Sequence, residues 1–128
     1  MKIRNDDMAN FRDLLVYHKS YEAALKIYRI VAQYLPPDEM YGLASQIKRA
    51  ATSIPMNIAE GYTKNIGDKE LLRFISMATG SCAEVKVLLD FLRDLGYISD
   101  NLHDEMMSIY DEIGKMLNGF RKSVTANI

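Results

Sequence analysis

Apolar residues recur three and four positions apart along almost the whole chain, which is the spacing of amphipathic helices. Helix-breaking residues divide this pattern into four segments, at the Pro36-Pro37 pair, at Gly61 and at Gly96. We therefore expect four helices, at about residues 13–35, 38–60, 68–95 and 100–122. Short connections favour antiparallel neighbours, and no segment alternates as a strand does. The pattern predicts an all-α fold, an antiparallel up-down-up-down four-helix bundle, with residues 1–128 as a single domain.

The first predicted helix is apolar around most of its circumference. Its polar residues form one narrow stripe, made of Lys19, Glu22, Lys26, Arg29 and Gln33. A helix that packs on one side of a monomer needs an apolar face only about 100° wide. This helix therefore either sits deep within its own bundle or also covers a partner chain. It carries Tyr17, Tyr21, Tyr28 and Tyr34, and tyrosine suits a subunit interface because it joins apolar area to a polar tip.

The second predicted helix has a core row that continues across a proline. The row consists of Met40, Leu43, Ala44, Ile47, Ala50, Ala51, Ile54 and Ile58. Pro55 removes one backbone hydrogen bond. Because the apolar row persists, we expect a kink near residues 51–55 and no break. Gly61 is expected to end the helix as a C-cap glycine.

The third and fourth predicted helices each carry an apolar seam at bundle spacing. The third seam is Leu71, Ile75, Ala78, Cys82, Val85, Leu89 and Leu92. The fourth is Leu102, Met106, Ile109, Ile113, Met116 and Phe120. Either Ser99 or Asp100 can cap the start of the fourth helix.

Two polar rows interrupt the apolar pattern where the second and third predicted helices would pack together. These rows contain Gln46, Arg49, Ser53, Asn57 and Glu60 on the second helix, and Ser81 and Glu84 on the third. For antiparallel pairing about Asn65, residue i lies opposite roughly residue 130 − i. An unpaired half-buried glutamate is costly, so we expect an Arg49–Glu84 ion pair. We expect a second contact from Glu60 to Lys69 or Arg73.

Two interpretations of these polar rows stay open. In the first, the polar groups set the register of the two helices, and small residues at Ala50-Ala51 and Gly80-Ser81 permit a close crossing. In the second, Arg49, Asn57 and Glu60 are left open as a ligand-binding site.

Composition and charge argue against several classes of function. The chain has 16 Lys and Arg against 17 Asp and Glu, for a net charge of −1, which disfavours strong nucleic-acid binding by bulk charge. The single cysteine, Cys82, excludes an internal disulfide framework and a multi-cysteine metal site. No apolar run is long enough to span a membrane and the start lacks a signal-peptide pattern, so we expect a cytoplasmic protein with no membrane partner.

No motif in the chain indicates catalysis. His18 and His103 are far apart and lack metal-ligand spacing, and no Glu-x-x-His pair of the di-iron type occurs. The phosphate-binding and nucleophile-elbow glycine motifs are also absent from the sequence. We therefore expect a protein that is not an enzyme, with no catalytic residues, cofactor or metal.

A long spaced motif resembles the four-helix bundle proteins encoded by intervening sequences in bacterial 23S rRNA genes. It runs through Gln46-Ile47-Lys48-Arg49-Ala50-x-x-Ser53-Ile54-Pro55-x-Asn57-Ile58-Ala59-Glu60-Gly61, and Phe74-x-x-x-Ala78-x-Gly80-Ser81-x-x-Glu84 fits it too. The resemblance covers roughly residues 11 to 120. It implies a four-helix bundle that assembles as a ring, commonly a homopentamer. Related accessory proteins of diversity-generating retroelements form such rings and bind a reverse transcriptase and nucleic acid.

We expect a non-catalytic homo-oligomeric scaffold or adaptor, a ring and most simply a pentamer, with RNA, DNA or a nucleic-acid-processing protein as further partners. The alternative is direct RNA or DNA binding by a basic patch at the hairpin between the second and third helices. That patch would contain Lys48, Arg49, Lys64, Lys69 and Arg73, with Tyr62 beside them. The retroelement relatives are strongly basic, whereas five copies of this chain would carry roughly minus five charges and repel a phosphate backbone at long range.

Overall fold

The computed structural model describes residues 10–63 and 67–128, which form four α-helices. These are α1 (Leu15–Tyr34), α2 (Leu43–Thr63), α3 (Asp68–Asp94) and α4 (Asp100–Thr125). Two short 3-10 turns, η2 (Phe11–Asp13) and η3 (Pro37–Glu39), precede α1 and α2. The described residues contain no strand.

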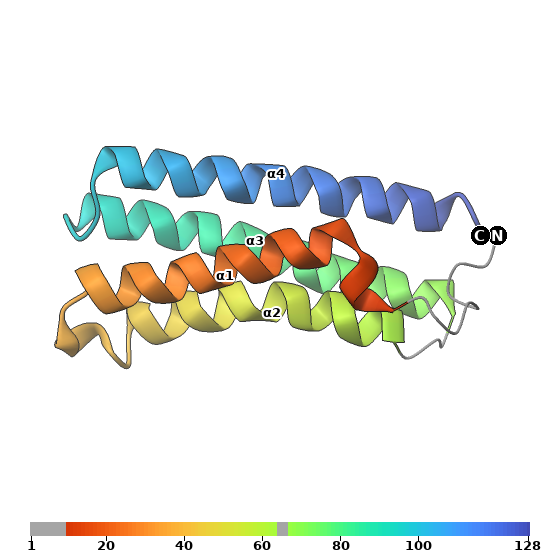
Figure 1. The fold of residues 1–128 in the computed structure, drawn as a ribbon, viewed down its shortest axis with the longest axis horizontal. Helices are drawn as coiled ribbons and strands as arrows, with labels where there is room; N and C mark the ends of the chain where they lie inside the picture. Colours follow the sequence, from red (N-terminus) through yellow and green to blue (C-terminus); the bar gives the residue numbers. More distant parts are fainter. Residues whose placement is uncertain (1–9, 64–66) are drawn as a thin grey trace.

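The helices form one antiparallel bundle (Figure 1). In Figure 1, α1 and α3 run in one direction along the long axis and α2 and α4 run in the other. Each helix packs on its neighbour in the sequence, and α4 returns to pack on α1. The α2–α3 interface is the most extensive and the α1–α4 interface is the smallest of these four. The expectation of an all-α four-helix bundle is confirmed.

Glu39 anchors one end of the bundle, where residues 37–39 form a separate 3-10 turn and α2 begins at Leu43 and not near residue 38. One carboxylate oxygen, Oε1, accepts a hydrogen bond from the backbone N–H of Leu43 at 3.1 Å. The other, Oε2, accepts a hydrogen bond from the Tyr97 hydroxyl at 2.8 Å. The first bond satisfies an amide at the start of α2 that has no partner within the helix. The second joins this start to the turn between α3 and α4.

The buried residues confirm the α3 seam and correct the α4 seam. All seven expected seam residues of α3 are buried. On α4, the buried side chains include His103, Tyr110 and Leu117, while Leu102 and Ile109 are only half-buried. Met106 and Ile113 are buried as expected, whereas Leu102, Ile109 and Met116 each stand one residue before a buried position. The reason is that the true seam passes through a histidine, which an apolar pattern does not select.

The sequence predicted that Gly61 would end α2 as a C-cap, but this prediction is wrong. Gly61 lies inside α2, which continues to Thr63. A Cβ placed there would lie 2.7 Å from the Cβ of Phe74 and 3.1 Å from Cδ1 of Leu71, both on α3. The glycine therefore allows the two helices to approach closely. The helix also continues through Pro55, as the apolar row indicated.

We expect Gly61→Ala to destabilise the fold by about 1–3 kcal/mol, because the new methyl group has no room between α2 and α3. Gly119→Ala is the matched control, since a Cβ at this helical glycine of α4 meets nothing within 4 Å. The control should gain about 0.5–1 kcal/mol from improved helix propensity. Urea unfolding of both variants measures the difference, and equal stability of the two would contradict the tight contact.

Candidate functional site

The polar rows of α2 and α3 meet at two serines. The hydroxyl groups of Ser53 and Ser81 form a short hydrogen bond to each other across the helix interface. Asn57 donates from Nδ2 to the backbone oxygen of Ser53 at 2.8 Å. Three residues of the expected polar rows, Ser53, Asn57 and Ser81, are thus joined, by one bond between the helices and one bond within α2.

The expected Arg49–Glu84 ion pair does not form. Both side chains are exposed, and no ion pair among the described residues joins them. Register is not the cause, because the Ser53–Ser81 contact places Arg49 near the level of Val85, next to Glu84. The pair does not form because both side chains are turned toward solvent. Gln46 is also exposed.

The basic residues expected at the α2–α3 hairpin do not gather into one patch within the described residues. Lys48 lies roughly 22 Å along α2 from Thr63 by helical rise, and its Nζ sits 5.1 Å from the centre of the Tyr28 ring on α1. Arg73 donates from Nε to Glu70 at 2.7 Å. The hydrogen bond to Glu70 raises the pKa of the Arg73 guanidinium, and the negative charges of Glu70 and, more weakly, Glu60 act in the same direction.

The remaining members of the expected patch are Lys69, Lys64 and Arg49. Lys69 is exposed, and Lys64 lies outside the described residues. Arg49 is exposed on α2. A nucleic-acid contact by these residues therefore stays a prediction.

An apolar groove of about 380 Å³ runs between α1 and α2. We name it the α1–α2 groove, and it is lined by Phe11, Tyr17, Tyr21, Ala24, Leu25, Tyr28, Thr52, Pro55, Met56 and Ala59. Its walls are large side chains with much of their surface exposed, 44% for Tyr28 and 65% for Met56. The bundle thus buries one side of α1 and leaves part of its wide apolar surface exposed, and coverage of that part by a partner chain stays a prediction.

A second apolar surface runs along the outward side of α3. We name it the α3 stripe, and it consists of Met77, Gly80, Glu84, Val87, Phe91 and Leu95. These positions recur three and four residues apart, so they lie on one side of the helix. Phe91 has 52% of its surface exposed and Val87 has 54%. Phe74 and Leu88, which are apolar residues of α3 outside the seam, are buried, whereas the apolar residues of the stripe are exposed.

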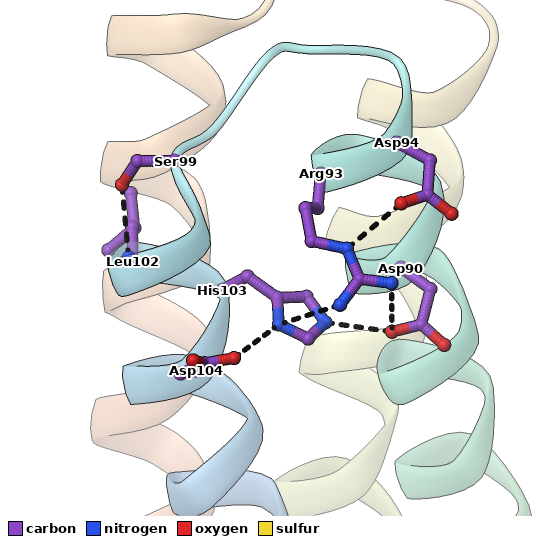
Figure 2. A network of polar contacts seen from close by, with 7 residues as sticks. All are labelled: Asp90, Arg93, Asp94, Ser99, Leu102, His103 and Asp104. Carbon is purple, nitrogen blue, oxygen red and sulfur yellow. Dashed lines mark hydrogen bonds and ion pairs between the residues drawn. The ribbon is translucent and has the colours of Figure 1, made fainter.

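A buried histidine network lies beside the turn between α3 and α4 (Figure 2). His103 is 5% exposed, and its two ring nitrogens face two carboxylates. Nε2 is 2.7 Å from Oδ1 of Asp90 on α3, and Nδ1 is 2.9 Å from Oδ1 of Asp104. The Arg93 guanidinium lies beside the imidazole ring, with Nη1 3.4 Å from Nδ1 of His103. Its Nε donates a hydrogen bond to Asp94 at 2.9 Å.

The two carboxylates favour the protonated imidazole. Hydrogen bonds to Asp104 and then Asp90 raise the pKa of His103, against opposing effects of burial and of the Arg93 charge. Sequence reasoning missed this network because it judged His103 only as a metal ligand. A usable signal was present, since His103 stands three residues before Met106 and seven before Tyr110, on the buried side of α4.

Comparisons with known proteins agree with this architecture. The family model described as 23S rRNA-intervening sequence protein matches residues 12–119. A solved structure from Bacteroides thetaiotaomicron, described as a protein with unknown function from the S23 ribosomal protein family, is similar with a TM-score of 0.74. Its sequence is 24% identical, and the alignment covers 84% of this chain and 99% of that chain. No curated protein matches significantly.

None of the helices in the described part of the chain combines the length and the hydropathy needed to cross a lipid bilayer. The match in fold to the Bacteroides protein, at this level of identity, concerns architecture alone.

We expect the stability of the protein to fall as the pH rises through the raised pKa of His103. The folded state holds this pKa above its ordinary value of 6.5, so the contribution of the imidazolium is complete below about pH 6.5 and is lost above the folded pKa. Urea unfolding between about pH 5.5 and pH 8.5 measures this loss. His103→Gln should flatten the profile, whereas His18→Gln, at an exposed position on α1, should leave it unchanged. An identical profile for wild type and His103→Gln would refute the role of the network.

Proposed function

We propose that this chain, which belongs to the 23S rRNA-intervening sequence protein family, is a non-catalytic scaffold that works as an assembly of several copies of itself. The observation that carries the proposal is the exposure of two separate apolar surfaces, the α1–α2 groove and the α3 stripe. A cytoplasmic location and the absence of catalysis are parts of the same proposal.

The arrangement of these exposed residues supports the proposal more than their number does. Single exposed apolar side chains are normal on soluble proteins. Large contiguous apolar patches mark interaction sites. Here the aromatic and aliphatic side chains are grouped, in a groove around Tyr28 and Met56 and in a row that includes Val87 and Phe91. Tyrosine, phenylalanine and methionine are the residue types enriched in interface cores.

Two different surfaces on one chain favour a closed assembly of identical subunits. When one patch binds a different patch on the next copy, each copy uses both, and the result is a ring or a filament. The resemblance to ring-forming relatives favours a ring of five as the specific form of this proposal. Such a ring would present the same outer surface several times, so that weak contacts with an RNA-associated partner would add by multivalency.

Direct binding of RNA or DNA is the weaker candidate. The side chain of Arg73 is already engaged by Glu70, and the Lys48 ammonium lies over Tyr28, away from the hairpin. The net charge of −1 offers no compensating long-range attraction to phosphate.

We expect the purified chain to have a native mass that is several times its 14.6 kDa subunit mass. Because the proposed contacts are apolar, raising the salt concentration from about 0.1 M to 1 M should not dissociate the assembly. Light scattering coupled to size exclusion, repeated over a range of concentrations, measures the mass. A single 14.6 kDa species at high concentration would refute the scaffold proposal.

We expect no retention of mixed-sequence RNA or duplex DNA by the assembled protein at about 0.15 M salt, because its overall charge is negative. Fluorescence anisotropy with labelled oligonucleotides tests this, with the salt concentration lowered stepwise. Binding that weakens steeply with salt and disappears in the double variant Lys69→Gln and Arg73→Gln would favour the alternative, direct nucleic-acid binding.

A further inference from the structure

We infer that the copies associate head to tail, with the α3 stripe of one copy lying in the α1–α2 groove of the next. This inference rests on the proposed function and goes beyond it by assigning the two surfaces to each other. The occupant of the groove is thus a second copy of this chain.

The two surfaces are complementary in shape and chemistry. The groove is a concave apolar site of about 380 Å³, with Pro55 and Met56 among its lining residues. The stripe lies on a single helix whose outward side chains, such as Val87 and Phe91, project beyond the bundle. A helix placed in an apolar groove buries side chains spaced three and four residues apart, which is the spacing of the stripe.

The relative height of the two surfaces along the bundle also fits. Ser53 on α2 bonds to Ser81 on α3, so these residues lie at the same level. Counting along the antiparallel helices from this point places Met77 and Gly80 near the level of Met56. The same count places Glu84 near the level of Lys48. In a ring whose axis runs along the helices, residues at equal height meet, so no shift between copies is needed.

Charge supports the same pairing. Glu84 lies in the middle of the apolar stripe, and no ion pair in the described part of the chain includes it. Lys48 lies at the edge of the groove over the Tyr28 ring, also without an acidic partner among the described residues. Docking of the stripe would give the carboxylate and the ammonium each other as partners, where an apolar surface alone would leave Glu84 unpaired.

Gly80 has no role within its own chain that requires a glycine. A Cβ at this position would meet nothing within 4 Å, and a glycine inside a helix costs roughly 0.5–1 kcal/mol relative to alanine. A close approach by another copy, with the Met56 side chain entering the notch, would account for the missing side chain. Gly119 is equally open within its chain, but it lies on α4, outside both surfaces.

The positions of the two surfaces favour closure over a straight filament. The groove lies between α1 and α2, and the stripe lies on α3, which packs on the other side of α2. The surfaces are therefore on neighbouring sides of the bundle. Successive copies that join neighbouring sides turn about an axis, whereas copies that join opposite sides extend in a line.

Cross-linking between two single variants tests the assignment directly. Met56→Cys places a thiol in the groove and Met77→Cys places one on the stripe, both at exposed positions. The native Cys82 is buried, and the wild-type chain controls for it. After the two variants are mixed in denaturant and refolded together, a short bismaleimide should cross-link one variant to the other, and neither variant alone should cross-link.

The possible results separate the inference from the proposed function. Efficient cross-linking of Met77→Cys to itself would show that two stripes face each other, and would overturn the inference while leaving a scaffold intact. An oligomeric mixture that shows no cross-link between the variants would also overturn it. A monomeric wild-type chain would overturn both proposals.

Substitutions on each surface give a second test with matched controls. Gly80→Arg should weaken assembly by about tenfold or more, while Gly119→Arg should leave it unchanged. Glu84→Lys and Lys48→Glu should each weaken assembly, and the double variant should recover it. Subunit association is measured by sedimentation, with circular dichroism confirming the helical fold of each variant. Equal effects of the two glycine variants, or a double variant no better than its singles, would refute the pairing.

Discussion

At Gly61 the backbone of α2 lies against the Cβ of Phe74 on α3, with no room for a methyl group between them. Further along the same interface, Ser53 and Ser81 share a hydrogen bond. These two contacts set the register of the most extensive helix pair in the bundle. Because a helix turns by a fixed angle at each residue, this register also determines which residues point away from the core.

The register of α2 and α3 matters for function because it determines which side chains face away from the bundle. With α2 and α3 held in this register, Glu84, Val87 and Phe91 face away from the bundle. On the other side of α2, Pro55 and Met56 contribute to a groove with the tyrosines of α1. A bundle of four helices can cover only the side of each helix that faces its centre. Apolar side chains beyond that width remain in water unless a further chain covers them.

The two polar networks have different roles in this arrangement. The serine pair lies between α2 and α3, and Asn57 bonds within α2 to the backbone of Ser53, so that these part-buried polar groups have partners. The His103 network lies at the far end of α3 and holds it to the start of α4 through Asp90. Its raised pKa couples the stability of this end to pH. Neither network forms an open pocket lined by polar groups, and this favours the interpretation that the α2–α3 polar rows set helix register.

Much of the architecture follows from the order of residues, because helix periodicity and helix-breaking residues act locally. The α3 seam and the passage of α2 through Pro55 could be predicted in this way. Contacts between helices could not, since they depend on how closely two surfaces approach. Gly61 reads as a helix end in sequence but serves packing in space. Arg49 and Glu84 look like partners in sequence, but in the described part of the bundle both side chains are exposed and no ion pair joins them. His103 looks polar and unremarkable until Asp90, brought close by the α3–α4 turn, makes its burial favourable.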